Sequence, residues 1–323
     1  MTAPLVTIGI TCFNAADTVE RAVISAVRQT WRPIEIIAVD DCSTDDTSTV
    51  VSQLAEIHPM LRVLRNEQNG GVAVTRNRIL AEASGDFVAF FDDDDESQPE
   101  RIAIQLERIL SYERTFAKGA FVVCHTARQL HYPDGSDRVL PTMGQDEQRC
   151  APAGLPVAER ILLGTPLENG YGACATCSQM GRLDMYRSLG GFDDAFRRSE
   201  DTEFNIRLAK AGGHFVGIAK PQVMQTMTKT SEKNLAEEYR NTLAVMEKHR
   251  DVMDRAGQYY FCRHLIDVKQ AWLEGRHADF ARMLGSLVRV HPVLTVRRLA
   301  LAVPNIGLNW AFGRFHRSDR GLV

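Results

Sequence analysis

Apolar and polar positions alternate regularly over roughly the first hundred residues of the chain. The runs "LVTIGITCF", "IEIIAVDD", "LRVLRN" and "DFVAFFDDDD" are short, apolar and rich in β-branched or aromatic residues, which predicts four strands. Between them, "DTVERAVISAVRQ", "STDDTSTVVSQLAEI" and "GVAVTRNRILAEA" carry apolar residues at helical spacing. Strands that alternate with helices predict right-handed crossovers and a mostly parallel sheet with helices on both faces.

The pattern continues less regularly to about residue 230. It predicts a helix in "ERIAIQLERILSY", a strand in "GAFVVCHTARQLHY", a strand and short helix in "MGRLDMYRSLGGF", a helix in "SEDTEFNIRLAKAG" and a strand in "HFVGIAK". The stretch 134–172 is rich in proline and glycine, and no element is assigned to it. From about residue 231 only helical patterns follow. We therefore expect an α/β domain over 1–230 and a C-terminal helical extension over 231–323.

Composition narrows the class of protein. With 323 residues and 44% hydrophobic content, the chain can bury a substantial core, and its net charge of −3 gives no general basic field for nucleic acid. Seven scattered cysteines in a chain too long to need disulfides fit reduced thiols and a cytoplasmic location. The single "CATC" pair lacks the further ligands of a zinc site, and the opening "MTAPLVTIGITCFN" has no signal-peptide pattern.

The C-terminal part is locally basic. From His277 to the end there are seven arginines against two acidic residues. The longest uncharged segment, Leu299 to Gly313, is shorter than the roughly 20 apolar residues that span a bilayer. Two interpretations stay open: a basic amphipathic surface on the inner face of a membrane, favoured slightly by Trp310, Phe312 and Phe315, or a packed helical extension with its arginines in solvent.

Polar residues follow the predicted strands at their ends. Thr11 to Asn14, Asp40 to Ser43, Asn69 to Gly71 and Asp92 to Asp95 all fall there. Ligands of open parallel sheets bind beyond the carboxyl ends of the strands. We therefore expect these four loops to line one crevice.

Four consecutive aspartates at a strand end need a compensating partner, because like charges oppose folding and raise one another's pKa. Asp-x-Asp offers hard oxygen ligands to Mg²⁺ or Mn²⁺ while leaving positions free for phosphate oxygens. The alternative is a helix N-terminus that collects acidic residues, which could explain Asp95 and Glu96. It explains Asp92 and Asp93 less well, since they directly follow a buried strand.

Other strand-end residues could contact a nucleotide. One of Asp40 and Asp41 is enough to cap the next helix, which leaves the other to accept hydrogen bonds from a base or ribose. Phe13 could belong to the core or stack on a nucleobase. In "SEDTEF", Glu200 and Asp201 form a second acidic cluster, which is either a complement to the helix dipole or part of a catalytic site.

The ordered set "VTIGITCFN", "AVRQTW", "IIAVDDCSTDDT", "NGGVAVTRNRIL", "FFDDDDESQPERI", "GGFDDAF" and "EDTEFNIRLAKAG" resembles the family 2 inverting glycosyltransferases with the GT-A fold. The resemblance covers roughly residues 4 to 225. It implies a Rossmann-like, mostly parallel sheet, a nucleotide-sugar donor that is usually UDP-linked, and a divalent metal, Mn²⁺ or Mg²⁺.

The resemblance also implies roles for individual residues. Asp201 of "EDTEF" would be the catalytic base, and Arg76 of "VTRN" would lie near the diphosphate. Two departures are Glu203, where the family more often has aspartate, and the run of four aspartates, which leaves the exact metal ligand open. The metal ligands would be Asp92 and Asp94, and the nucleotide-binding set would comprise Thr11, Phe13, Asn14, Asp40, Asp41, Arg76 and Asp93.

We expect a non-processive enzyme that adds one hexosyl or N-acetylhexosaminyl unit to a glycan or lipid-linked acceptor in bacterial cell-surface polysaccharide synthesis. Processive relatives carry a QxxRW motif, whereas "QMGRLD" at Gln179 lacks the tryptophan. A sugar-nucleotide nucleotidyltransferase would open with a glycine-rich, basic phosphate loop, and "TCFNAADT" has neither residue type. A scaffold that keeps the fold without the chemistry is the second alternative, although all three acidic sites are intact.

Overall fold

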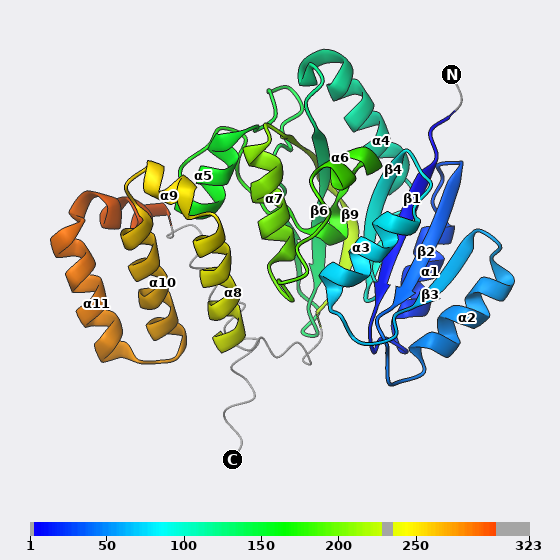
Figure 1. Ribbon diagram of the computed structural model, residues 1–323, viewed down its shortest axis with the longest axis horizontal. Helices are drawn as coiled ribbons and strands as arrows, with labels where there is room; N and C mark the ends of the chain where they lie inside the picture. The colour runs from blue at the N-terminus through cyan, green and yellow to red at the C-terminus, as the bar shows by residue number, and fades with distance from the viewer. Residues whose placement is uncertain (1–2, 228–234, 302–323) are drawn as a thin grey trace. The chain divides into compact units, whose positions relative to one another are not determined.

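The computed structural model describes residues 3–227 and 235–301 of the chain (Figure 1). The chain divides into two compact units. The first comprises Met1–Ile161 with Thr165–Met227, and the second comprises Leu162–Gly164 with Thr228–Val323. Each unit has its own buried core.

The first unit is built on one mixed sheet with the strand order β3-β2-β1-β4-β8-β6-β9-β5, with β7 added beside β6. Its first four strands are parallel to one another, as the sequence pattern predicts. In the register, Thr11 of β1 lies opposite Val39 of β2 and Asp92 of β4, so the ends of these strands meet at one edge. The four strands are β1 (Val6–Cys12), β2 (Ile34–Asp40), β3 (Leu61–Arg65) and β4 (Phe87–Asp92).

The rest of the sheet mixes directions. Strand β8 (Met180–Arg182) is antiparallel to β4 and β6, whereas β6 (Val122–His131) and β9 (His214–Thr226) are parallel to each other. Strand β5 (Asp95–Ser97) starts only two residues after β4 ends, yet it pairs with β9 at the far end of the strand order. The sheet therefore curls, and the run of four aspartates spans the two-residue bend between β4 and β5.

The structure fills part of the stretch 134–172 with β7 (Asp137–Leu140) and α5 (Leu155–Leu163), which the sequence pattern did not predict. The predicted helix at Ser43 or Thr44 starts later, at Thr47, because the side chains of Ser43 and Thr44 bond to Asp40 and Asn14 in the preceding loop. The remaining helices of this unit are α1 (Val19–Val27), α2 (Thr47–Ile57), α3 (Val72–Glu82), α4 (Arg101–Tyr112), α6 (Leu183–Ser188) and α7 (Glu200–Lys210).

Burial along the first strands and helices explains why they form. All residues of β1 except Thr11 are buried, and Val19, Val23 and Ala26 of α1 are buried at helical spacing in the same core. Helices α3, α6 and α7 lie on the near face of the sheet in Figure 1. A strand buried on both faces is the expected result of helix-covered parallel pairing.

The described residues of the second unit are helical. They form α8 (Leu235–Lys248), α9 (Arg250–Arg255), α10 (Tyr259–Leu273), α11 (His277–Val290) and a further helical segment over 292–301. Met253, Phe261, Val268 and Leu287 are buried among them. Among the described residues, no helix combines the length and apolar character needed to cross a bilayer. Most of the Leu299–Gly313 segment, with Trp310 and Phe312, and also Phe315, lies outside the described residues.

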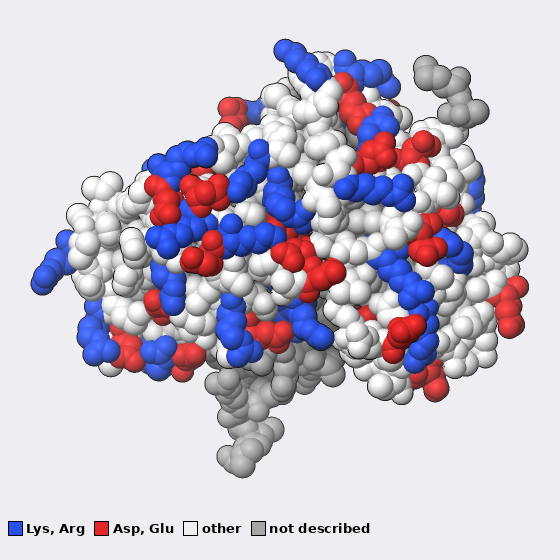
Figure 2. Space-filling view, in the orientation of Figure 1, with Lys and Arg blue, Asp and Glu red and all other residues white. Residues whose placement is uncertain are grey.

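Charged side chains of both signs are interspersed over the face shown in Figure 2, and neither sign dominates it. This distribution agrees with the net charge of −3. The face shown therefore has no broad basic surface of the kind that binds nucleic acid through its phosphates.

Candidate active site

The loops after β1 and β2 are bonded to each other. The backbone N–H of Asn14 donates to Ser43 Oγ at 2.9 Å, and its side-chain Oδ1 accepts from the Thr44 N–H at 2.8 Å. The Ala15 N–H donates to Thr47 Oγ1 at 2.7 Å. Asn14 has φ of 49°, in the left-handed region that asparagine tolerates better than most residues. The two loops therefore lie together, as predicted, and direct hydrogen bonds join them.

Asp40 lies inside the protein at the end of β2. Its side chain is fully buried, forms an ion pair with Arg65 Nη1 at 2.9 Å and accepts hydrogen bonds from the N–H and hydroxyl of Ser43. Asp40 therefore holds the start of the loop before α2. Its predicted place beside the nucleoside stays a prediction.

Asp41 holds the loop before α3. One carboxylate oxygen accepts from Asn66 Nδ2 at 2.7 Å and from the Gly70 N–H at 3.0 Å, and the other accepts from the Gly71 N–H at 2.8 Å. Both Asp40 and Asp41 therefore have partners within the protein. A nucleoside contact of Asp41, which stays a prediction, would share the carboxylate with these donors.

Thr11 and Phe13 lie at the end of β1. The Phe13 ring is 47% exposed, so the alternative of a core position is wrong. Its backbone N–H donates to Asp93 Oδ2 at 2.8 Å, which holds the Phe13 backbone beside the aspartate run. Thr11 is half-buried opposite Asp92. An exposed aromatic ring at this position is available for stacking on a base.

The first two aspartates of the run point to different neighbours. Asp93 accepts the Phe13 N–H, and burial raises the pKa of its carboxyl to about 7. Asp92 is half-buried and accepts from Arg76 Nη2 at 3.2 Å. Asp93 therefore ties the run to β1, while Asp92 faces α3.

The last two aspartates also differ. Asp94 is exposed and its carbonyl oxygen accepts from Arg21 Nη2 at 2.7 Å, while Asp95 is buried and accepts from Gln225 Nε2 at 2.8 Å. Burial raises the pKa of both carboxyls, and the neighbouring charges of Asp92 and Asp94 help to raise that of Asp95 to about 8. A cation near Asp95 would relieve this destabilised charge.

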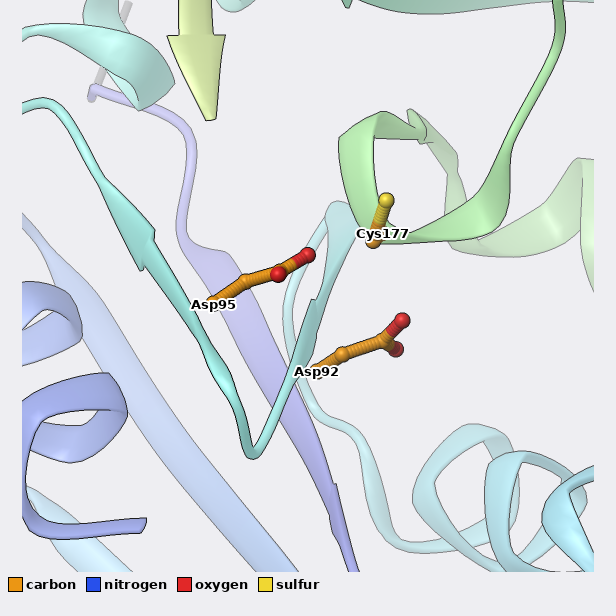
Figure 3. A group of neighbouring side chains, drawn as sticks. All are labelled: Asp92, Asp95 and Cys177. Carbon is orange, nitrogen blue, oxygen red and sulfur yellow. The ribbon is translucent and has the colours of Figure 1, made fainter. Parts of the chain in front are cut away.

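Asp92, Asp95 and Cys177 bring three possible metal-ligand atoms together, all within 4.8 Å of one another (Figure 3). The two carboxylates come from the two arms of the β4–β5 bend and point to the same side, toward the sulfur. Asp94, predicted as the second ligand, is not a member of this group. Carboxylate oxygens suit a divalent cation, so Asp92 and Asp95 fit the kind of metal that the resemblance implies, whereas the sulfur of Cys177 is not a typical ligand of Mg²⁺.

Cys177 is the member of this group that the sequence reasoning missed. It lies in a single helical turn, Thr176–Ser178, and its burial raises the pKa of the thiol. The signal was the "CATC" sequence, which attracted attention only as a pair of cysteines. Asp95 belongs to β5, so the alternative of a helix N-terminal acid does not apply to it.

Arg76 joins the two acidic clusters. Its Nη2 bonds to Asp92 on β4, and its Nη1 bonds to Glu200 at the start of α7. The guanidinium is buried and lies 5.5 Å from the centre of the Phe192 ring. Both carboxylates raise the pKa of Arg76 against the effect of burial. Glu200 is therefore half of a buried ion pair, which goes beyond the alternative of a complement to the helix dipole.

Asp201, the predicted base, follows Glu200 in the first turn of α7 and is half-buried. Its Oδ1 accepts from the N–H of Thr202 at 2.6 Å and from the Thr202 hydroxyl at 3.2 Å. Glu203, where the family more often has aspartate, is completely buried and accepts three hydrogen bonds from Arg207. It serves the packing of α7, and Asp201 is the more accessible of these two acids.

The segment "GGFDDAF" packs α7 against α3. Asn77 on α3 accepts from the Phe192 N–H at 2.8 Å and donates to the Phe192 carbonyl at 2.7 Å. Gly191 has φ of 69°, and a Cβ added there would lie 2.4 Å from Asn77 Oδ1. Glycine is therefore required at this position, and it lets the loop bring Glu200 within reach of Arg76.

Residues 7–152 match the family description "Glycosyl transferase family 2". The chain is 38% identical over 114 residues to a putative teichuronic acid biosynthesis glycosyltransferase, TuaG, of Bacillus subtilis, which is 35% of this chain and 45% of that protein. It is 34% identical over 125 residues to an Escherichia coli UDP-Glc:alpha-D-GlcNAc-diphosphoundecaprenol beta-1,3-glucosyltransferase, WfaP, which is 37% of this chain and 49% of that protein. The chain thus matches less than half the length of either relative.

Solved structures share the fold at low sequence identity. TarS of S. aureus, residues 1–349 in complex with UDP-GlcNAc, has a TM-score of 0.58 at 20% identity, covering 88% of this chain and 76% of that one. The mannosyltransferase PcManGT of Pyrobaculum calidifontis, in complex with GDP-Man and Mn²⁺, has a TM-score of 0.57 at 16% identity, covering 94% of this chain and 80% of that one. The curled, mostly parallel sheet is therefore the GT-A fold.

Proposed function

We propose that the protein, whose residues 7–152 match glycosyltransferase family 2, is an inverting enzyme that transfers one sugar from a nucleotide-sugar donor to an acceptor hydroxyl. Inversion by one in-line displacement needs a base for the acceptor hydroxyl and a means of stabilising the leaving diphosphate, but no covalent nucleophile. The proposal therefore depends on two acidic groups that face one crevice.

The observation that carries the proposal is the position of Arg76. One buried guanidinium contacts Asp92, at the end of β4, and Glu200, the residue before Asp201. Two acidic clusters more than a hundred residues apart in sequence are thereby held at one place. An ion pair that served the fold alone would not need Asp201, the more exposed acid that follows Glu200 on α7.

Each residue then has a chemical role. Asp201 takes the proton of the acceptor hydroxyl, and the two bonds from Thr202 to its Oδ1 fix the orientation of the carboxylate. Asp92 and Asp95, with Asp94 at the exposed side, would hold the cation. A divalent cation, Mn²⁺ or Mg²⁺, supplies charge neutralisation for the diphosphate when bound. Arg76 keeps Asp92 and the start of α7 at a fixed separation.

The nucleotide would bind at the ends of β1 and β2. The exposed ring of Phe13 offers a stacking surface, and Thr11, Asn14, Asp40, Asp41 and Asp93 shape the loops around it. We propose a UDP-linked hexose or N-acetylhexosamine as donor, because TarS, which shares the fold, is in complex with UDP-GlcNAc. GDP-Man, the ligand of PcManGT, is the alternative donor to compare.

We propose a glycan or lipid-linked acceptor in cell-surface polysaccharide synthesis. The support is that WfaP is a glucosyltransferase for a diphosphoundecaprenol-linked sugar and that TuaG is a putative glycosyltransferase of teichuronic acid biosynthesis. Such an acceptor would place the enzyme in the cytoplasm, in peripheral contact with the inner face of the membrane. Residues 280–301 carry four arginines and no acidic residue, which suits an anionic lipid surface.

The test is the variant Asp201→Asn in a panel of nucleotide sugars, with release of nucleotide measured in the presence of acceptor. Loss of the base should lower the transfer rate by about 10²–10⁴-fold while nucleotide binding, followed by calorimetry, is unchanged. Asp184→Asn is the matched control, because Asp184 is an exposed acid in the first turn of another helix, α6.

Equal rates for Asp201→Asn and the wild-type protein would show that Asp201 is not the base. A wild-type protein that binds nucleotide sugars but releases none of the nucleotide would favour the scaffold. Formation of pyrophosphate from a nucleoside triphosphate and a sugar 1-phosphate would instead favour a nucleotidyltransferase.

A further inference from the structure

The group of Asp92, Asp95 and Cys177 differs from an all-oxygen site by its sulfur atom. Cys177 comes from a segment about eighty residues further along the chain than the aspartates, and it is 4% exposed. Figure 3 shows its sulfur on the side of the β4–β5 bend to which both carboxylates point. The three donor atoms are close enough to bind one ion, since all lie within 4.8 Å of one another.

A buried pair on α4 holds both parts of this group. Gln105 Nε2 donates to the carbonyl of Ser178, the residue after Cys177, at 2.9 Å. Arg101 Nε donates to Gln105 Oε1 at 3.0 Å, and its Nη1 donates to Ser97 Oγ on β5 at 2.8 Å. The turn that carries Cys177 and the strand that carries Asp95 are therefore fastened to the same framework. A site with donors on fixed elements is preorganised for a ligand.

The sulfur has only weak contacts with the protein. Gln225 Nε2 lies 3.8 Å from Cys177 Sγ and Arg128 Nη1 lies 3.9 Å from it. Both nitrogens have a better acceptor, because Gln225 Nε2 donates to Asp95 at 2.8 Å and Arg128 Nη1 donates to Gln225 Oε1 at 2.8 Å. Sulfur is a weak acceptor, so a cation would displace little when it binds there.

We propose that Cys177 is a metal ligand and that Asp92, Asp95 and Cys177 together bind a thiophilic divalent cation, Zn²⁺ or Co²⁺, in preference to Mg²⁺. Thiolates are soft ligands that favour zinc-like ions, whereas Mg²⁺ requires oxygen donors in near-octahedral geometry. The thiol loses its proton when the ion binds, and the proton passes to solvent. The inference deepens the proposed function. It rests on that function only for the role that the bound ion plays in sugar transfer.

The test is a titration of the full-length protein, stripped of metal with a chelator, with Co²⁺. A cobalt–thiolate bond produces a charge-transfer band in the near ultraviolet that oxygen and nitrogen ligands do not produce. We expect the band in the wild-type protein and its loss in Cys177→Ser. Cys150→Ser is the matched control and should keep the band, because Cys150 is an exposed cysteine outside the group.

Two further variants test the carboxylate. Asp95→Asn should weaken the binding of Co²⁺, measured from the same band, whereas Glu96→Gln, at an exposed position on the same strand and outside the group, should leave it nearly unchanged. Zn²⁺ should abolish the band by competition at lower concentration than Mg²⁺. Absence of the band in the wild-type protein, or its persistence in Cys177→Ser, would overturn the inference.

The outcome is distinguishable from failure of the proposed function. Sugar transfer with Mn²⁺ or Mg²⁺ in a protein that shows no cobalt–thiolate band would refute the sulfur ligand and leave the transferase standing. A band that depends on Cys177, in a protein that transfers sugar from no nucleotide donor, would support the sulfur ligand and refute the transferase. Thermal unfolding of Cys177→Ser confirms that its loss of the band is not loss of the fold.

Discussion

The guanidinium of Arg76 is shared by two carboxylates in a buried place. Asp92 and Glu200 each take one of its terminal nitrogens, and the Phe192 ring lies beside it. A lysine ammonium cannot reproduce this arrangement, because it is a point charge without the planar fork of arginine. Removal of Arg76 would leave two carboxylates near each other without their cation.

Arg76→Met should therefore destabilise the protein by about 3–5 kcal/mol, the usual cost of breaking a buried ion pair. The measurement is urea unfolding followed by circular dichroism. Arg62→Met is the matched control, because Arg62 and Glu82 form an exposed pair at 2.8 Å, and its loss should cost less than about 1 kcal/mol. A small effect of Arg76→Met would show that Asp92 and Glu200 find other partners.

His125 is a second buried residue with a measurable consequence. Its Nε2 lies 3.0 Å from Gln179 Nε2, which can only donate, so the imidazole accepts there and is neutral. Burial, and then the positive charges of Arg128 and Arg101, lower the pKa of His125 to about 3. In the folded protein His125 therefore binds a proton only at a much lower pH than in the unfolded chain, where its pKa is about 6.5.

The folded pKa lies below the unfolded one, so this contribution to stability is complete above about pH 6.5 and falls as the pH is lowered. We expect the free energy of unfolding to fall by up to about 1.4 kcal/mol per pH unit between pH 6 and 4 because of His125 alone. His125→Gln should remove this part of the slope in urea titrations at several pH values. Parallel slopes for variant and wild type would contradict the assignment.

Sequence reasoning located the polar residues of the site but not their partners. Thr11, Asp40 and Asp92 were placed correctly at strand ends because strand boundaries follow from local apolar patterns. The directions of Asp93, Asp94 and Asp95 depend on the bend between β4 and β5, which four identical residues do not reveal. The proximity of Cys177 depends on contacts across the sheet, and no local pattern encodes these.

At the scale of elements, α4 connects the site to the rest of the sheet. Gln105 Nε2 donates to the carbonyls of Cys124 on β6 and Ser178, and Arg101 Nη2 donates to the carbonyl of Phe90 on β4. Arg101 and Gln105 are completely buried one helical turn apart. The helix therefore fixes two strands and the turn Thr176–Ser178 with polar contacts in addition to its apolar face.

Gln105→Met would keep the volume of the side chain and remove these bonds. Each buried carbonyl that loses its partner should cost about 1–3 kcal/mol, so the midpoint of urea unfolding should fall clearly. Gln53→Met is the control, because Gln53 is exposed on α2 and its replacement should leave the midpoint nearly unchanged. An equal midpoint for both variants would mean that water replaces Gln105 in the core.

The elements differ in how far the sequence predicts them. Strands β1 to β4 and helices α1 to α4 were predicted because each has its own periodic pattern and the connections are short. Strand β5 has three residues and no pattern of its own, and it exists because it pairs with β9, which begins more than a hundred residues later. The starts of helices are equally sensitive to context, as the late start of α2 illustrates.

On the scale of the molecule, the C-terminal helices differ from the rest in charge and exposure. Residues 280–301 contain Arg282, Arg289, Arg297 and Arg298 and no acidic residue. Apolar side chains in the same stretch face solvent, with Val293 78% exposed and Val296 61% exposed. Arginines around exposed apolar residues are the composition of a helix that lies on an anionic membrane.

The protein should therefore float with vesicles that contain phosphatidylglycerol and not with vesicles of phosphatidylcholine alone. Each basic residue near an anionic surface contributes about 1 kcal/mol, so Arg289→Glu with Arg297→Glu should lower vesicle binding more than about tenfold. Arg28→Glu with Arg114→Glu changes the net charge equally on exposed residues of the first unit and should have little effect.

Added salt should weaken the binding of the wild-type protein, since the Debye length shortens. Equal loss of binding in both double variants would show that total charge matters and not this surface. A dimer in light scattering that disappears on Val293→Asp would instead show that a second copy covers the apolar side chains.

The four residues Asp92 to Asp95 have different partners, and this restricts how the sequence can vary at this bend. Each carboxylate has its own neighbour because the bend is two residues long between β4 and β5. Deleting one aspartate would change the local charge by a single unit, but it would shift β5 by one position and turn its alternate side chains to the opposite face. Replacing one aspartate by Asn or Ser would remove the contacts of that residue alone, whereas deleting one residue would rearrange the contacts of all four positions. The number of residues in the bend is therefore a stricter requirement than their acidity.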